Sequence, residues 1–281
     1  MEKIKVFESF AGYGSQSFAL ELLRNDIGLD YEVVGISEID KTATMAYYAA
    51  RDERLDPDSE RFNAEYVESL IAKKQTYQPS EELQSRYPNF GDITKIDWEN
   101  VPDFNLLTYS FPCTDISTAG LQKGLAEGSG TRSSLLWECA KAIQTKRPKY
   151  LLMENVKALV SDKFIPDFRR WMKWLEDMGY ANFHQVLNSK DFGVPQNRER
   201  VFMISILSDD AIYYFPKPFK LDRRLKDVLE KNVDESFYLS DKKIQDIIDH
   251  CNRKQSQTKL GEEEIKDMDS YLENMMDSNE E

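Results

Sequence analysis

The chain has 281 residues, of which 41% are hydrophobic and 12% aromatic, and its formal net charge is -13. This apolar content excludes a disordered chain, and this length suffices for one large core or for a core with a small appendage. The acidic balance argues against a protein that simply coats nucleic acid, because such a protein needs Lys and Arg to neutralise phosphates, although it leaves room for a local basic cleft.

The start of the chain and its cysteines predict a soluble, cytoplasmic protein. No long apolar run follows a basic start, and no run approaches the roughly 20 apolar residues that span a bilayer. The three cysteines, Cys113, Cys139 and Cys251, cannot all pair within one chain, so we expect free thiols in a reducing compartment. With only two histidines and no Cys/His cluster, no zinc site is predicted.

Strand-like and helix-like runs alternate along the chain. Strands are expected in IKVFESF, YEVVGIS, FNLLTYS and YLLMENV and at the end of VPQNRERVFMI. Helical spacing follows the first run up to Gly28, resumes from about Lys41, and continues in RSSLLWECAKAIQTKRP and FIPDFRRWMKWLEDMGY. The last helix would carry an apolar stripe of Phe164, Phe168, Trp171, Leu175 and Met178. The alternation predicts an α/β fold with a mostly parallel central sheet and helices on both faces.

Two segments interrupt the alternation. Residues from about 52 to 90 are polar and contain several prolines, so we expect a partly helical insertion between the second and third strands. Beyond about Pro216 the remaining chain, residues 216–281, has the pattern of outer helices, and much of its acid lies near the C-terminal end. A solvated tail is the simplest interpretation of that end.

A turn with two glycines follows the first predicted strand. Gly12 and Gly14 lie in FAGYGSQS, at the sheet edge where such turns offer backbone N–H groups to ligands. Ser17 replaces the third glycine of a dinucleotide fingerprint, and Glu38 after the second strand is placed to hold ribose hydroxyls. The pattern favours a nucleoside ligand with little phosphate, although two glycines alone also suit a purely structural turn.

Cys113 directly follows Pro112 at the end of the third predicted strand. A cysteine beside an apolar strand is usually a small buried hydrophobe. Here Glu154 ends another predicted strand, and Arg198 and Arg200 precede one more. A thiol, a carboxylate and two guanidiniums at the same end of a sheet would be costly to bury as packing groups, but together they can carry out catalysis. Each of them alone would more often be an ordinary core or surface group.

Together these motifs resemble those of the DNA (cytosine-5) methyltransferases, in family order over roughly residues 4 to 206. The matching segments are FESFAGYGS, SEID, GDI, SFPCTDIS, GTRSSLLWE, MENV and QNRERV. The resemblance implies a Rossmann-like S-adenosylmethionine-dependent methyltransferase fold, and methylation of cytosine C5 in double-stranded DNA as in restriction-modification systems. It also implies a catalytic and cofactor-binding domain over residues 1–215, with residues 216–281 as an extension or the start of a truncated recognition region.

The resemblance implies a role for each matching residue. Cys113 would add as a thiolate to C6 of a cytosine flipped out of the duplex. Glu154 would protonate or hydrogen-bond N3, while Arg200, supported by Arg198, would hold O2. The loop over residues 118–134, rich in glycine, would be a lid. The residues implied around the methyl donor are Phe10, Gly12, Gly14, Glu38, Asp92, Ile93, Pro112 and Leu135.

Two departures from the family leave alternatives open. Thr114 stands where many members carry Gln, and residues 207–281 contain neither a recognisable target-recognition domain nor the ninth and tenth motifs. We therefore expect a truncated enzyme, one half of a split enzyme whose partner chain supplies recognition, or an inactive relative. The alternative functions are a catalytically incomplete subunit that binds cofactor or a partner chain, and an RNA cytosine methyltransferase.

Overall fold

A computed structural model of the chain describes residues 3–72, 76–116, 123–126, 128–231, 233–234 and 237–257. Its residue contacts divide it into two units, Met1–Arg224 and Leu225–Glu281. The domain boundary expected near residue 215 stays a prediction.

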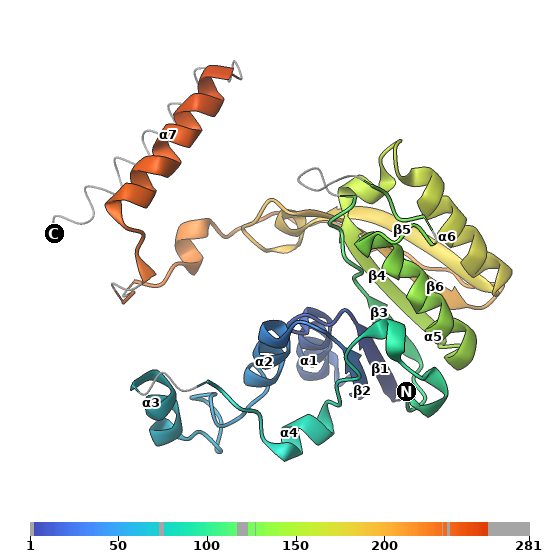
Figure 1. Ribbon diagram of the computed structural model, residues 1–281, viewed down its shortest axis with the longest axis horizontal. Helices are drawn as coiled ribbons and strands as arrows, with labels where there is room; N and C mark the ends of the chain where they lie inside the picture. Colours follow the sequence, from blue (N-terminus) through green and yellow to red (C-terminus); the bar gives the residue numbers. More distant parts are fainter. Residues whose placement is uncertain are drawn as a thin grey trace. The chain divides into compact units, whose positions relative to one another are not determined.

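The first unit contains a six-stranded sheet with the order β2-β1-β3-β4-β6-β5 (Figure 1). Its strands are β1 (Ile4–Ser9), β2 (Tyr31–Ser37), β3 (Leu106–Tyr109), β4 (Tyr150–Val156), β5 (Tyr180–Asn188) and β6 (Glu199–Leu207). β1 pairs in parallel with β2 and β3, and β3 pairs in parallel with β4. β6 runs antiparallel to both β4 and β5. The predicted mostly parallel sheet is confirmed, with its reversal at the β6 strand.

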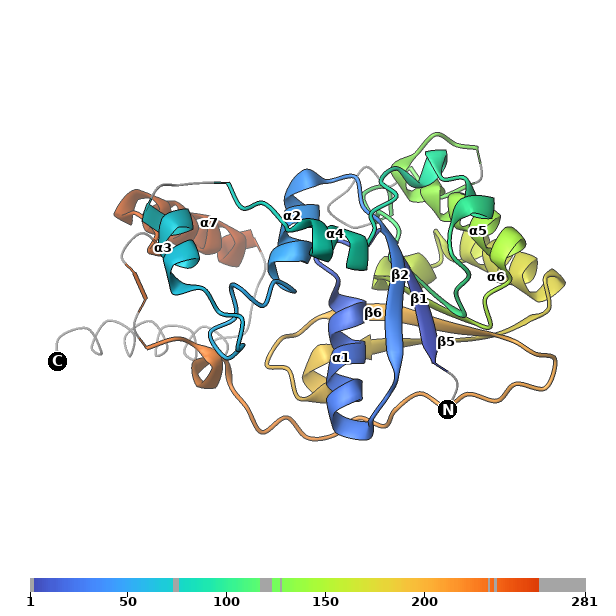
Figure 2. The ribbon, with the colours of Figure 1, turned by 90° about the horizontal axis from the view of Figure 1, so that it is seen from below.

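Helices cover both faces of this sheet, as predicted. The helices of this unit are α1 (Ser15–Ile27), α2 (Lys41–Ala49), α3 (Ala64–Ala72), α4 (Glu81–Arg86), α5 (Glu138–Lys146) and α6 (Ile165–Asp177). Figures 1 and 2 show α1 and α2 on one side of the sheet and α5 and α6 on the other. Neighbouring residues of β1 belong to different cores because strand side chains alternate between faces: Val6 packs with α2, and Phe7 packs with α5 and α6.

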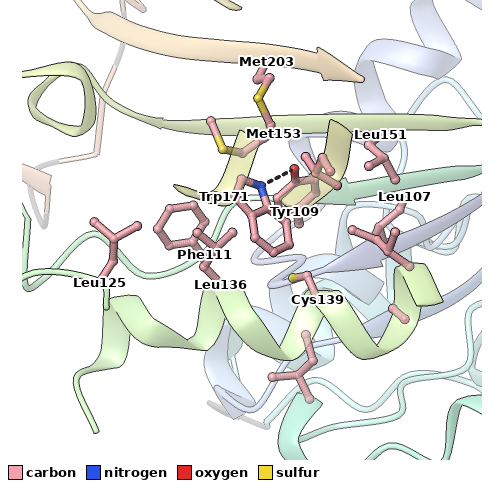
Figure 3. Close-up of a cluster of buried hydrophobic side chains, with 14 of the residues drawn as sticks. Leu107, Tyr109, Phe111, Leu125, Leu136, Cys139, Leu151, Met153, Trp171 and Met203 are labelled. Atoms are coloured by element: carbon pink, nitrogen blue, oxygen red, sulfur yellow. Dashed lines mark hydrogen bonds between the residues drawn. The ribbon is translucent and has the colours of Figure 1, made fainter. Parts of the chain in front are cut away.

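The larger core lies between the sheet and the pair α5 and α6 (Figure 3). The α6 stripe is buried at Phe164, Phe168, Trp171 and Leu175, while Met178 is partly buried against the same core. The Trp171 indole N–H donates a hydrogen bond to the Tyr109 hydroxyl at 3.2 Å, and both side chains are fully buried. This bond satisfies a polar group that would otherwise be costly to bury.

Two elements differ from the expectation. β5 was not predicted, because its sequence YANFHQVLN mixes polar and apolar residues without a clear period of two. It is one of the two edge strands and pairs with β6, so backbone hydrogen bonds hold it without full burial of its side chains. The helix expected from Arg132 begins as a 3₁₀ segment, Arg132–Trp137, which the Thr131 side chain caps, and α5 starts only at Glu138.

The second unit contains a short 3₁₀ segment, Leu225–Val228, and α7 (Asp241–Gln257). The acidic end expected to be a solvated tail lies beyond residue 257, outside the described residues. No helix in the described ranges combines the length and the apolar character needed to cross a bilayer.

Replacing Tyr109 by Phe tests the polar contact inside the larger core. The change removes the acceptor of the Trp171 indole N–H without altering the ring, so we expect the free energy of unfolding to fall by about 1–3 kcal/mol. Urea unfolding followed by fluorescence measures this loss. Tyr214→Phe is the matched control, since Tyr214 is 84% exposed, and should change stability by less than about 0.5 kcal/mol. Equal effects of the two changes would contradict the prediction.

Candidate active site

The turn after β1 has an unusual backbone conformation. Phe10, Gly12 and Gly14 all have positive φ angles, of 57°, 56° and 84°. Phe10 is one of two non-glycine residues with positive φ in the described chain, and this conformation costs an L-residue about 1–2 kcal/mol. Such strain persists only where the surroundings hold it, and it is concentrated at functional sites.

The two glycines meet different surroundings. A Cβ atom on Gly12 would have no heavy atom within 4 Å, so this part of the backbone faces open space. A Cβ atom on Gly14 would lie 2.5 Å from the Tyr47 ring and closer still to the Arg51 Nη2 atom, nearer than a Cβ atom packs against non-bonded atoms. Gly14 is therefore required by tight packing at the start of α1, whereas Gly12 leaves the backbone open to a ligand.

Glu38 lies beside this turn, as the sequence predicted from its place after β2. Its carboxylate accepts hydrogen bonds from the backbone N–H groups of Gly12 and Asp40, each at 2.8 Å. Asn89 fixes the Glu38 backbone by a reciprocal pair of bonds at 3.1 and 3.0 Å. The carboxylate that is expected to hold ribose hydroxyls thus also ties the end of β2 to the glycine turn.

Asp92 and Ile93 start a short 3₁₀ segment, Ile93–Lys95. The Asp92 carboxylate accepts hydrogen bonds from the side chain and the backbone of Thr94, and these bonds lower the pKa of Asp92. Ile93 is only 4% exposed and packs into the larger core. The Ile93 side chain therefore supports the fold here, and only its backbone is left to contact a ligand.

A cleft of about 710 Å³ brings several predicted site residues together. It runs from the turn after β1 along α1 and over one face of β3, β4 and β6. Polar groups in it include the Gln16 amide, which donates to the Ser110 hydroxyl at 2.9 Å. The predicted residues that line it are Phe10, Gly12, Glu154, Arg198 and Arg200. The predicted residues outside this lining are Gly14, Glu38, Asp92, Ile93, Pro112, Cys113 and Leu135.

Glu154 and the two arginines form an ion-pair cluster in this cleft. The Arg200 Nε atom lies 3.2 Å from Glu154 Oε1, and an Arg198 Nη2 atom lies 3.9 Å from the same oxygen. The antiparallel register of β4 and β6 places Val156 opposite Arg200, which brings the start of β6 beside the end of β4. The Glu154 and Arg200 side chains are 22% and 24% exposed, so water reaches the pair but does not surround it.

The loop that carries Cys113 is fixed by hydrogen bonds to neighbouring segments. Asn155 donates to the Phe111 carbonyl at 2.9 Å, and the Ser133 hydroxyl donates to the Pro112 carbonyl at 2.7 Å. The Asp115 carboxylate accepts from the Arg132 backbone N–H at 2.8 Å. Cys113 itself is partly buried.

These loop anchors were not predicted, although all of them lie within the motifs that the sequence singled out. Asn155 follows Glu154 in MENV, and Asp115 and Ser133 lie in SFPCTDIS and GTRSSLLWE.

A second thiol, Cys139, is fully buried in the larger core, and burial raises its pKa. Cys139 is thus an inert packing group. Residues 118–122 and 127 of the expected lid lie outside the described residues.

Residues 62–281 match the family model described as C-5 cytosine-specific DNA methylase. The Type II methyltransferase M2.ScrFI of Lactococcus lactis subsp. cremoris is 42% identical over an alignment 263 positions long, which covers 86% of this chain and 72% of that protein. The Orphan methyltransferase M.SssI of Spiroplasma monobiae is 37% identical over an alignment 276 positions long, which covers 85% of this chain and 68% of that protein.

Solved structures support the fold. The crystal structure of S. pombe Dnmt2 methyltransferase matches with a TM-score of 0.57 at 17% identity and covers 89% of this chain, which spans 66% of that protein. The Entamoeba histolytica methyltransferase EhMeth matches with a TM-score of 0.56 at 18% identity, over 85% of this chain and 63% of that one. At these identities the likeness concerns the fold alone.

Alanine at each of the two glycines should have unequal effects on stability. Gly14→Ala combines a left-handed conformation with a clash against Tyr47, so we expect a loss of about 2–5 kcal/mol in the free energy of unfolding. Gly12→Ala meets no clash and should lose only the conformational part, about 1–2 kcal/mol. Urea unfolding of both variants measures the difference, and equal losses would refute the packing explanation for Gly14.

Proposed function

The chain belongs to the C-5 cytosine-specific DNA methylase family, and from this premise we propose that it transfers a methyl group from S-adenosylmethionine to C5 of cytosine in double-stranded DNA. The observation that supports this most is the shared cleft. The strained turn at Phe10 and the Glu154–Arg200 pair come from opposite halves of the sheet and line the same space.

The proposed chemistry starts at Cys113. Its thiolate adds to C6 of the flipped cytosine, forming the S–C6 bond and moving an electron pair toward C5. Glu154 donates a proton or hydrogen bond at N3, which stabilises the charge that develops in the ring, and the guanidinium of Arg200 holds O2. After the methyl group has been transferred to C5, loss of the C5 proton to a base breaks the S–C6 bond and releases the thiolate.

The residues around the turn fit the donor. S-adenosylmethionine, when bound, supplies an electrophilic methyl group. Phe10, an aromatic residue, lines the cleft, and Gly12 offers a backbone without a side chain in the way. We assign Glu38 to the ribose hydroxyls and Asp92 to the adenine amino group, with Gly14, Ile93, Pro112 and Leu135 completing the pocket.

Recognition of a DNA target is a separate part of the proposal. The chain spans 72% and 68% of its two bacterial relatives and 66% of the S. pombe protein, so we propose that further sequence or a second chain supplies target recognition. We also propose a cytoplasmic location, because three cysteines without a disulfide pattern are typical of a reducing compartment.

Covalent trapping tests the proposed reaction. Duplex DNA that contains 5-fluorocytosine retains the adduct, because fluorine replaces the proton that must leave C5. With S-adenosylmethionine present, the wild-type chain should form a complex that survives a denaturing gel, and Cys113→Ser should form none. Cys251→Ser is the matched control, since Cys251 is exposed on α7, and it should behave as the wild type.

The other outcomes separate the alternatives. Donor binding by calorimetry without any adduct would contradict a self-sufficient enzyme and favour an incomplete subunit that needs a partner chain. Methylation of tRNA without methylation of DNA would contradict the DNA substrate and favour the RNA methyltransferase. An adduct in Cys113→Ser would refute the thiol mechanism.

Glu154→Gln should separate chemistry from donor binding. The amide cannot donate a carboxyl proton at N3, so we expect the rate of adduct formation to fall by about 10²–10⁴-fold. The Kd for S-adenosylmethionine should stay within about twofold of the wild-type value, which calorimetry measures. Glu199→Gln is the control, because Glu199 precedes Arg200 but pairs with Lys157 at the surface. An unchanged rate in Glu154→Gln would remove Glu154 from the mechanism.

A further inference from the structure

Arg51 lies outside every motif considered so far, just after the end of α2. We propose that Arg51 is a positioning residue for the methyl-donor site, and that its guanidinium holds the turn from Phe10 to Gly14 in the shape that the donor binds. The inference rests on the proposed function, since it concerns the same cleft.

The guanidinium contacts the turn directly. Its Nη1 atom donates to the Tyr13 carbonyl at 3.1 Å, and its Nη2 atom donates to the Gly14 carbonyl at 3.0 Å. Nη1 also donates to the Tyr47 carbonyl at 2.9 Å, and Nη2 donates to the Ser17 hydroxyl. One planar group therefore links two successive carbonyls of the turn to the end of α2 and the start of α1, a geometry that the rigid fork of arginine allows.

Aromatic rings hold the guanidinium in place. Its central carbon lies 3.6 Å from the centre of the Tyr47 ring and 4.5 Å from the centre of the Phe18 ring. These rings favour a cation over their faces and restrict the rotation of the arginine side chain. Arg51 is thus a preorganised support and not a mobile surface cation.

A buried carboxylate completes the arrangement. Glu8 is fully buried, and its two oxygens accept from the Tyr47 hydroxyl at 2.6 Å and the Ser17 backbone N–H at 3.1 Å. Burial raises the pKa of Glu8, while the bonds from Tyr47 and Ser17 and the charge of Arg51 oppose that rise. Glu8 therefore fixes the ring on which Arg51 stacks and the first turn of α1, which also contacts Arg51.

The turn is held from two sides. Glu38 binds the Gly12 N–H from the end of β2, and Arg51 binds the carbonyls of Tyr13 and Gly14 from the end of α2. Phe10 needs such external support, because a positive φ is sterically unfavourable for a residue with a Cβ atom, whereas Gly12 and Gly14 adopt it without that penalty. Without Arg51 the turn would have to be ordered when the donor binds, and the affinity would fall by that cost.

Calorimetric titration of the full chain with S-adenosylmethionine tests the proposal. Arg51→Gln removes the charge and the fork, and we expect the Kd to rise about tenfold, which corresponds to about 1.4 kcal/mol. Arg51→Lys keeps the charge near Glu8 but lacks the planar fork that makes all four bonds at once, so its Kd should lie between those of Arg51→Gln and the wild type. Arg61→Gln is the matched control, because Arg61 is 65% exposed and pairs only with exposed carboxylates, and its Kd should not change.

Affinity and folding are read separately in this experiment. Thermal unfolding of each variant gives the temperature range in which it is folded, and the titration is done within that range. A lower melting temperature and lower binding stoichiometry with an unchanged Kd would show that Arg51 only stabilises the fold, and would overturn the proposal. If Arg51→Gln does not fold, the Kd of Arg51→Lys decides, and a wild-type value would overturn it.

Failure of the proposed function gives a different result. A wild-type chain that does not bind S-adenosylmethionine would contradict the donor site and this inference together. A wild-type chain that binds the donor, with Arg51→Gln binding equally well, would contradict this inference alone.

Discussion

β6 runs against β4, and the first residues of β6 therefore lie beside the last residues of β4. This antiparallel contact brings the guanidinium of Arg200 to 3.2 Å from the Glu154 carboxylate. In a wholly parallel sheet, the residues before one strand lie near the amino ends of all the strands. The last residues of the neighbouring strand lie near the carboxyl ends, so Arg200 could not reach Glu154. The cleft depends on this reversal, because Arg198 and Arg200 supply its cationic groups.

The other side of the cleft depends on a turn whose backbone conformation is unfavourable at Phe10, a residue with a Cβ atom. Phe10, Gly12 and Gly14 have positive φ angles, and side chains from other segments hold the turn between them. The carboxylate of Glu38 binds one N–H group, and the guanidinium of Arg51 binds two carbonyls. The carboxylate thus binds an N–H group of this short backbone segment, and the guanidinium binds its carbonyl groups. Gly12 stays open toward the cleft.

The nucleophile loop shows how closely the motifs cooperate. Asn155 and Ser133 bind the carbonyls that precede Cys113, and they come from two other motifs that are far away in the chain. Polar side chains near the expected catalytic residues thus have a structural task, which is to fix the backbone of a loop that has no regular secondary structure. The four-residue motif MENV therefore contains two kinds of residue. Glu154 lines the cleft, and Asn155 fixes the backbone of the neighbouring loop.

Much of this organisation could be predicted from local pattern. The period of α6, the Gly28 end of α1 and the strands of the parallel part follow from hydrophobic spacing and from caps, which act over a few residues. β5 could not be predicted in the same way, because an edge strand is stabilised by its partner and its side chains need not alternate. The burial of Glu8 could not be predicted either. A single carboxylate in an apolar run does not show which hydroxyl and N–H groups of other segments will donate hydrogen bonds to it.

The fold class, the order of the motifs and the chemical types of the expected site residues follow from the amino-acid sequence, because they depend on residue identity and on short-range spacing. The reversal of β6, the contact of Glu154 with Arg200 and the hydrogen bonds of Arg51 to the glycine turn are visible only in the folded chain. These contacts join residues separated by tens of positions. No local periodicity encodes them, and they arise only when the strands and helices pack.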